Sequence, residues 1–347
     1  MRLTKQRILF MLILLGGLLF IAACSSDNPD TSDVDNESSE KDDEEVENPE
    51  EGSSEEPVTL PEEVLHKSNT GDMVTALQHI LIEIGYPIEV TGTYDEETTW
   101  AITDFQLQHE ALNATGIYES ETKSEIEQIL EGGNQVESGE NLSKPANNQA
   151  EEKSELGNPY DVLALINKVN LLPADYYPED LTVPNVRFSF DGDDPKKQLR
   201  KVAADALEEL FAAADEAGLE LFALSGFRSY DRQDAIFAAN AQKHGEEHAN
   251  TFSARPGESE HQSGLAMDVT SPAVNYDLVI EFGETAEGKW LAENASKFGF
   301  IIRFLEGKED ITQYQYEPWH IRYVGVEVAK EVMDQGITLE EYFANKE

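Results

Sequence analysis

The sequence predicts a small all-α domain followed by a larger α+β domain, and three observations lead to this fold class. Apolar residues recur at helical spacing between residues 60 and 131. From 158 to 347, helical segments mix with short apolar strands, without the regular βαβ alternation of a doubly wound sheet. Two strongly polar stretches, 24–58 and 132–157, flank the helical region and contain few residues that could join a core.

Composition excludes several classes of function. The formal net charge is −45, with 70 acidic and 25 basic side chains, whereas nucleic acid binding needs clustered Lys and Arg. Cys24 is the single cysteine, which rules out an internal disulfide and a cysteine-rich zinc site. Any bound metal must therefore take histidine and carboxylate ligands.

Residues 1–23 are predicted to be a lipoprotein signal peptide. Basic residues precede a continuous apolar run from 8 to 20, which is short for a transmembrane helix of about 20 apolar residues. The run leads into Ile-Ala-Ala-Cys, ending at Cys24, which resembles the bacterial lipobox whose cysteine is diacylated. Two acyl chains suffice for stable anchoring. We expect an extracytoplasmic protein that is lipid-anchored through Cys24 to the outer face of the cell membrane; an uncleaved anchor with an incidental cysteine is the alternative.

The two polar stretches are predicted to be linkers. Residues 24–58 consist almost entirely of Asp, Glu, Ser, Asn and Pro, and they contain no aromatic side chain. Such a segment is expected to be disordered and extended by its own charge. It would act as a tether between the membrane and the folded domains, and residues 132–157 would separate the two domains from each other.

Residues 60–131 combine a helical pattern with two matching turns. The apolar face of the first predicted helix consists of Met73, Val74, Leu77, Ile80, Leu81 and Ile84. The pattern Thr-Gly-x-Tyr occurs at 91–94 and again at 115–118, and each copy leads into an acidic helix start. We interpret the two turns as equivalent devices that deliver the chain into a helix.

This segment resembles the three-helix peptidoglycan-binding domain of many cell-wall hydrolases. The matching residues are Gly71, Val74, Leu77, Gln78, Leu81, Gly85, Tyr86, Gly92, Tyr94, Thr98, Ala101, Phe105, Gln106, Gly116 and Thr122. The resemblance implies a shallow groove for wall glycopeptide, and an unrelated helical spacer is the alternative. Tyr94, Trp100 and Gln106 are equally compatible with core positions and with ligand contacts.

In the second region, 158–347, the predicted elements alternate irregularly. An amphipathic helix is predicted from Leu199 to Phe211, and apolar residues between Trp290 and Phe298 indicate another. Residues 221–224, 300–304 and 320–324 are predicted strands. This mixture favours an α+β domain.

Two of the seven histidines have neighbours that indicate metal binding. His261 is followed seven residues later by Asp268, and Gly264 between them permits a tight bend after which two strand segments could direct both side chains to one point. His320 supplies a third ligand. Three protein ligands leave a fourth position open for water, which is the arrangement of a catalytic zinc site.

Two further residues suggest catalytic chemistry. Glu317 lies three residues before His320 and could take a proton from water. Residues three apart in a regular strand face opposite sides, so we expect Pro318 to distort the strand. Arg228 follows a predicted strand and a glycine turn, where its guanidinium could bind a carboxylate or an oxyanion. A structural salt bridge is the alternative role for Arg228.

Three motifs closely resemble the VanY-type D-alanyl-D-alanine carboxypeptidases, which belong to the wider LAS group of metallopeptidases. They are Ser-Gly-Phe-Arg-Ser-Tyr at 225–230, Ser-Glu-His-Gln-Ser-Gly-Leu-Ala-Met-Asp at 259–268 and Glu-Pro-Trp-His at 317–320. The resemblance covers nearly all of 159–337 and implies a small antiparallel sheet with helices. It also implies one Zn²⁺ ion bound by His261, Asp268 and His320, a catalytic base at Glu317, a stabilising role for Arg228, and substrate-side positions for Ser259 and Gln233.

The resemblance leads us to expect a monomeric, zinc-dependent D,D-carboxypeptidase that removes the terminal D-Ala from peptidoglycan stem peptides. Phe227 stands where the family more often has Tyr, which removes a hydroxyl and keeps the ring. An L,D-carboxypeptidase or a peptidoglycan endopeptidase on the same scaffold is one alternative. A non-catalytic wall-binding lipoprotein is another, although the complete set of ligands and base argues against it.

Overall fold

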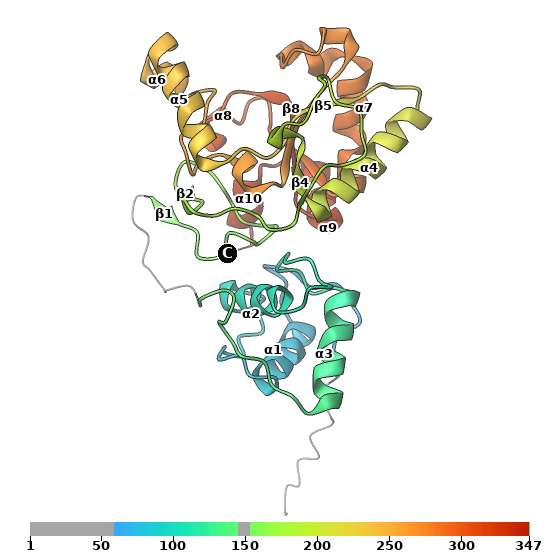
Figure 1. Ribbon diagram of the computed structural model, residues 1–347. Helices are drawn as coiled ribbons and strands as arrows, with labels where there is room; N and C mark the ends of the chain where they lie inside the picture. The colour runs from blue at the N-terminus through green and yellow to red at the C-terminus, as the bar shows by residue number, and fades with distance from the viewer. Residues whose placement is uncertain (1–58, 145–152, 347) are drawn as a thin grey trace, which may run out of the picture. The chain divides into compact units, whose positions relative to one another are not determined.

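The structure is a computed structural model that describes residues 59–144 and 153–346 (Figure 1). The predicted signal peptide, Cys24 and the linker 24–58 lie outside the described residues, as does part of the second predicted linker. Within the described ranges, none of the helices has both the length and the apolar character needed to cross a membrane.

Three helices form the first described range, which confirms the predicted all-α fold (Figure 1). They are α1 (Asp72–Glu83), α2 (Glu96–Leu107) and α3 (Ser120–Gly132). One apolar cluster holds them together, with Leu77 from α1 and Ile126 from α3 among its fully buried members. Tyr94 and Trp100 belong to the same cluster, so both are core residues. The Asp95 carboxylate caps α2 by accepting a hydrogen bond from the Thr98 amide at 2.9 Å.

The two Thr-Gly turns are held in the same way by two buried glutamines. The Gln78 Oε1 atom accepts hydrogen bonds from the backbone amides of 91–92 at 3.0 and 2.9 Å. The Gln106 Oε1 atom accepts from the amides of 115–116 at 2.8 and 2.9 Å. The glycine of each turn has a left-handed φ, 68° in the first and 72° in the second. The turns are therefore equivalent, as the sequence indicated, and Gln106 is a scaffold residue.

Residues 153–346 form an α+β domain around a four-stranded antiparallel sheet with the order β5-β6-β8-β7. Its strands are β5 (Phe222–Ser225), β6 (Ala266–Thr270), β7 (Phe300–Phe304) and β8 (Glu317–Tyr323). Two short ladders lie outside this sheet, and they pair β1 (Ser154–Glu155) with β2 (Asn170–Leu171) and β3 (Leu181–Thr182) with β4 (Leu199–Arg200). The three predicted strands correspond to β5, β7 and β8.

Helices of very different length surround the sheet (Figure 1). The α-helices are α4 (Lys201–Glu216), α5 (Tyr230–His244), α6 (Glu246–Ala249), α7 (Ala286–Asn294), α8 (Glu309–Thr312), α9 (Val326–Gln335) and α10 (Leu339–Ala344). The 3-10 helices are η1 (Pro195–Lys197), η2 (Glu260–Ser263), η3 (Pro272–Val274), η4 (Ile280–Glu284) and η5 (Ala295–Phe298). The helix predicted from Leu199 begins two residues later, because Leu199 and Arg200 pair with β3.

The main apolar core lies between one face of the sheet and the helices α4 and α7. Strand β6 contributes Met267 and Val269 to this core, where they join Leu207 of α4 and Leu291 of α7. Successive side chains of a strand point to opposite faces, so Asp268 projects away from the core. The apolar pattern of β6 thereby sets the direction of its single carboxylate.

Gly264 is required by both backbone conformation and space. It ends η2 with a left-handed φ of 70°, and β6 begins two residues later. A Cβ atom at this position would lie 2.9 Å from Arg200 Cγ and 3.0 Å from Leu181 Cδ2. The bend between His261 and Asp268 therefore depends on a residue without a side chain.

We expect Gly264→Ala to lower the free energy of unfolding by more than Gly218→Ala does. Gly218 is a matched control, because its φ of 74° is similar and no heavy atom lies within 4 Å of a Cβ built there. The control variant measures the cost of a left-handed backbone alone, which is about 1–2 kcal/mol. Denaturant unfolding of both variants checks this, and equal losses would contradict the role of close packing at Gly264.

Candidate metal centre and active site

Asp268 and His320 are direct partners in the antiparallel ladder between β6 and β8. Partners in such a ladder project from the same face with Cβ atoms about 4.5–5.5 Å apart. The Asp268 Oδ1 atom lies 3.0 Å from His320 Nδ1, and both side chains are buried. Trp319 and Ile321, on either side of His320, belong to the apolar core and fix the direction in which the imidazole points.

His261 reaches the same point from a different kind of element than we expected. The sequence analysis placed it on a strand segment, and this was wrong, because His261 lies in the 3-10 helix η2. Its Nδ1 atom is 2.9 Å from the carbonyl oxygen of Gly226. A proton on Nδ1 donated to that carbonyl leaves the lone pair of Nε2 free, 3.4 Å from Asp268 Oδ2.

The three residues fit a single metal ion. Each offers one ligand atom, and these atoms all lie within 4.8 Å of one another. Zinc–ligand bonds of about 2.0–2.2 Å place neighbouring ligand atoms of a tetrahedral site roughly 3.4 Å apart. Asp268 Oδ1 lies 3.0 Å from His320 Nδ1 and Oδ2 lies 3.4 Å from His261 Nε2, so each imidazole is at about that spacing from one carboxylate oxygen. Two imidazoles with one carboxylate form a donor set typical of catalytic zinc.

Glu260 supports His320 from behind and was not identified from the sequence. Its Oε2 atom lies 3.3 Å from His320 Nε2, and its Oε1 atom accepts hydrogen bonds from Arg303 Nε at 2.7 Å and Arg322 Nη1 at 2.8 Å. Burial raises the pKa of Glu260, but the two arginines outweigh burial and hold the pKa well below its usual range. An ionised Glu260 can therefore accept a hydrogen bond from a protonated Nε2 of His320. The lone pair of Nδ1 is then available to bind a metal ion.

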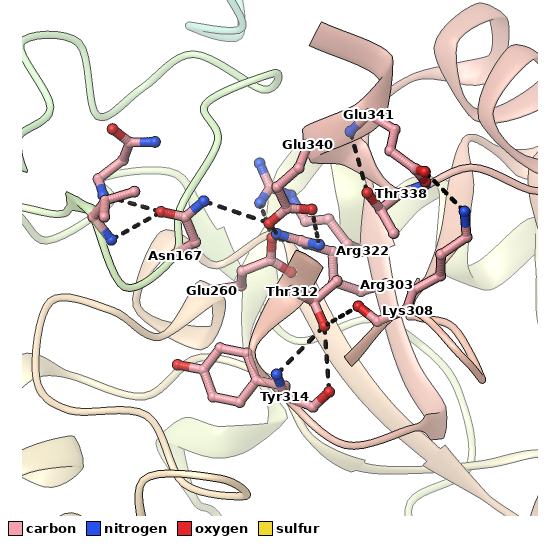
Figure 2. Close-up of polar contacts among 12 residues, drawn as sticks. Asn167, Glu260, Arg303, Lys308, Thr312, Tyr314, Arg322, Thr338, Glu340 and Glu341 are labelled. Carbon is pink, nitrogen blue, oxygen red and sulfur yellow. Dashed lines mark hydrogen bonds and ion pairs between the residues drawn. The ribbon is translucent and has the colours of Figure 1, made fainter. Parts of the chain in front are cut away.

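The two arginines are themselves fully buried and fully engaged (Figure 2). Arg303 binds both carboxylate oxygens of Glu340, at 2.9 and 2.7 Å. Arg322 donates to the carbonyl oxygens of Val162 and Ala164, at 2.9 and 3.0 Å. Glu260 thus belongs to a closed buried network, which restricts its movement and that of the imidazole it contacts.

Glu317 enters the site through an irregularity in β8. In the β7–β8 ladder, Ile302 pairs with Ile321 and Phe304 pairs with Glu317, so β8 advances four residues where β7 advances two. Pro318 lies in this bulge and has no backbone N–H to offer. Glu317 and His320 consequently line the same cavity, which agrees with the distortion expected at Pro318. Burial raises the pKa of Glu317 to about 8, against the opposing effect of His320.

Arg228 lines the same cavity as the three candidate metal ligands, and hydrogen bonds to its neighbours fix its orientation. Its Nη1 atom donates to Gln233 Oε1 at 2.8 Å and its Nη2 atom donates to Ser225 Oγ at 3.1 Å. Gln233 Nε2 in turn donates to the carbonyl oxygen of Ala254 at 2.6 Å. Gln233 therefore supports Arg228 and does not line the cavity, which differs from the substrate-side position expected for it.

A cavity of about 310 Å³ collects the other predicted site residues. Those that line it are Arg228, Ser259, His261, Asp268, Glu317 and His320. Glu258 and Glu260 also line it, although neither was identified from the sequence. One cavity therefore holds three residues that could bind a metal ion, a carboxyl group with a raised pKa and a guanidinium group, a combination typical of metallohydrolases.

Comparison with known proteins identifies the family. Residues 196–326 match the family described as "VanY: D-alanyl-D-alanine carboxypeptidase", and residues 70–126 match "Putative peptidoglycan binding domain". The chain is 54% identical over 186 residues to "Putative carboxypeptidase YodJ" of Bacillus subtilis, a match that covers 54% of this chain and 68% of that protein. It is 34% identical to a D-alanyl-D-alanine carboxypeptidase of Enterococcus faecalis, over 52% of this chain and 65% of that protein.

A solved structure is similar in both sequence and fold. The LdcB LD-carboxypeptidase is 51% identical, with a TM-score of 0.55, over 57% of this chain and 92% of that chain. The chain belongs to the VanY carboxypeptidase family and carries an N-terminal peptidoglycan-binding domain. The predicted combination of an all-α domain and an α+β domain is confirmed.

We expect Glu260→Gln to weaken metal binding by about 10–100-fold, because the neutral amide is a poorer acceptor for the His320 Nε2 proton. The matched control is Glu340→Gln, which removes the other carboxylate bound to Arg303 and leaves the contact with His320 in place. Both variants should lose stability, since each leaves a buried arginine short of a partner.

Metal affinity is measured by competition with a chromophoric chelator, and stability by thermal unfolding of the same samples. Loss of metal affinity in Glu260→Gln alone would show that Glu260 orients His320 for metal binding. Equal affinities in the two variants would show that Glu260 only stabilises the fold.

Proposed function

We propose that this chain is a zinc-dependent carboxypeptidase that removes the terminal D-alanine from peptidoglycan stem peptides. The observation that carries the proposal is the convergence of His261, Asp268 and His320 beside Glu317 in one cavity. Membership of the VanY family supports the reaction, and the N-terminal domain supports the wall as its location.

Glu317 is the proposed base. A bound zinc ion would act as a Lewis acid toward water and toward the scissile carbonyl. Glu317 would take the proton of the attacking water and pass it to the leaving amine, which restores the carboxylate for the next turnover. A buried carboxyl group with a raised pKa suits both transfers, because it holds a proton and releases it near neutral pH.

Arg228 and Ser259 are proposed to bind the peptide. Arg228 has N–H groups beyond the two that bond to Gln233 and Ser225, and its guanidinium lines the cavity. These donors would bind the terminal carboxylate of the peptide or the oxyanion that forms at the attacked carbonyl. Ser259 lines the same cavity directly before Glu260 and His261, so its hydroxyl is placed for a polar contact with substrate.

The bond that is cleaved has two candidates. Identity of 51% with a structure described as an LD-carboxypeptidase favours cleavage after the third residue of a tetrapeptide. The expected D,D activity, on a pentapeptide ending in D-Ala-D-Ala, is supported by the 34% identity to a D-alanyl-D-alanine carboxypeptidase. The higher identity leads us to propose the L,D reaction as the main activity and the D,D reaction as the second candidate.

The remaining parts of the chain complete the proposal. The helical domain would hold the enzyme on wall glycopeptide, which raises the local concentration of stem peptides. Acylation of Cys24 would anchor the protein to the outer face of the membrane, as the lipobox resemblance implies. One zinc ion per monomer is sufficient for this scheme.

We expect the purified chain to release D-alanine from a stem tetrapeptide faster than from the corresponding pentapeptide, as measured by mass spectrometry of the products. A metal chelator should abolish release, and added Zn²⁺ should restore it. Release from the pentapeptide alone would make the D,D reaction the activity. Absence of release from both peptides after Zn²⁺ addition would contradict the proposed function and favour a wall-binding role.

We expect Glu317→Ala to retain bound zinc while kcat falls by at least about 100-fold, because general acid–base catalysis contributes at least that factor. Zinc content is measured by elemental analysis on the same sample. Glu293→Ala, at an exposed position on α7, controls for the loss of one negative charge. Full activity of Glu317→Ala would remove this residue from the mechanism.

A further inference from the structure

Glu258 is a buried carboxylate in the wall of the active-site cavity. The proposed mechanism gives this carboxylate no role. Its side chain is only 1% exposed, and it lines the same cavity as the three candidate metal ligands. One oxygen, Oε1, binds Lys153 Nζ at 2.6 Å. The other oxygen, Oε2, is buried and has no hydrogen-bond partner in the described part of the chain. An ionised oxygen in that position is costly unless a donor reaches it.

Tyr314 presents a second unpartnered group in the same wall. Its hydroxyl is buried without a hydrogen bond among the described residues, and its ring lines the cavity. The hydroxyl points away from the backbone contacts that fix the residue to Thr312 (Figure 2). Burial raises the pKa of Tyr314, and Glu258 contributes the most to that rise among the charged groups, so the carboxylate and the phenol face the same region.

The position of Tyr314 relates this region to the metal cluster. The Tyr314 ring lies 4.9 Å from the Phe304 ring, and the Phe304 ring lies 5.1 Å from the His320 imidazole, between centroids. Tyr314 is thus one aromatic ring away from a metal ligand. Glu258 and Tyr314 line the same cavity as His320, so a substrate bound at the metal ligands can extend a side chain toward them.

Two other buried carboxylates beside the metal-ligand cluster have their own partners. Glu260 is bound by two arginines and His320, and Asp268 contacts both imidazoles. Lys168, whose ammonium lies 4.5 Å from the Tyr314 ring centroid, donates to the carbonyl oxygens of Asn250 and Gln313. Glu258 Oε2 therefore keeps its accepting capacity for a group that enters the cavity.

Aromatic side chains around this region favour an alkyl chain that ends in a cation. Phe252, Phe304 and Tyr314 all line the cavity, where their rings can contact methylene groups and attract an ammonium group. We propose that Glu258 and Tyr314 form a subsite for the side-chain ammonium group of a diamino acid that precedes the terminal D-alanine. This inference rests on the proposed carboxypeptidase function and identifies what its substrate carries beside the scissile bond.

The test compares the tetrapeptide L-Ala-γ-D-Glu-L-Lys-D-Ala with the same peptide acetylated on the lysine Nε atom. Acetylation removes the positive charge and keeps the scissile bond, so it should lower kcat/KM of the native chain on the order of tenfold. In Glu258→Gln the two peptides should be hydrolysed at similar rates, close to the rate of the acetylated peptide. Tyr314→Phe should reduce the discrimination in part.

Glu247→Gln is the matched control, because it removes one carboxylate from the exposed surface of α6 and should leave the discrimination unchanged. Metal content and thermal unfolding of each variant show whether the site is intact. Equal hydrolysis of both peptides by the native chain would overturn the subsite and leave the carboxypeptidase function standing. An equal loss on both peptides in Glu258→Gln would also overturn it, and no hydrolysis at all would instead contradict the proposed function.

Discussion

The direct pairing of Asp268 with His320 across β6 and β8 is the constraint on which the rest of the site depends. A slip of one residue in this ladder would turn the Asp268 carboxylate into the apolar core and Met267 into the cavity. The core residues beside each ligand oppose such a slip, since their burial stabilises one register only. His261 is then added from η2, and Glu317 through the bulge in β8, so both are placed relative to this pair.

Four buried carboxyl groups line one cavity, and their partners assign them different chemistry. The charge of Glu260 is balanced by two arginines, so its carboxyl group remains ionised and can orient an imidazole through a hydrogen bond. Asp268 faces two imidazoles and suits metal binding. Burial outweighs the effect of His320 on Glu317 and raises its pKa into the range where it can exchange protons. Glu258 has one oxygen bound to Lys153 and one without a hydrogen-bond partner among residues 59–144 and 153–346, which suits recognition of a donor.

The helical domain shows how a repeated motif can be structural. Gln78 and Gln106 each close a Thr-Gly turn by accepting two backbone hydrogen bonds, and the turns deliver the chain to α2 and α3. The two amides of the second turn are buried and would otherwise lack an acceptor, at a cost of about 1–3 kcal/mol each. The conspicuous aromatic residues Tyr94 and Trp100 are buried in the core, so any contact with wall glycopeptide must come from other, more exposed side chains.

The sequence alone predicted the fold class, which the structure confirms. It also proposed His261, Asp268, His320, Glu317 and Arg228 as site residues, and the fold brings all five to one cavity. Each lies in a short motif whose bend, strand or proline is local, so its chemistry could be inferred from neighbouring residues. Tertiary structure decided which side chains contact and orient these site residues. Glu260 contacts arginines 43 and 62 residues away, and among 70 acidic residues no spacing rule could select that pairing. The roles of Gln233 and Glu258 likewise depend on which side chains pack around them, because burial and hydrogen bonding are properties of the folded chain.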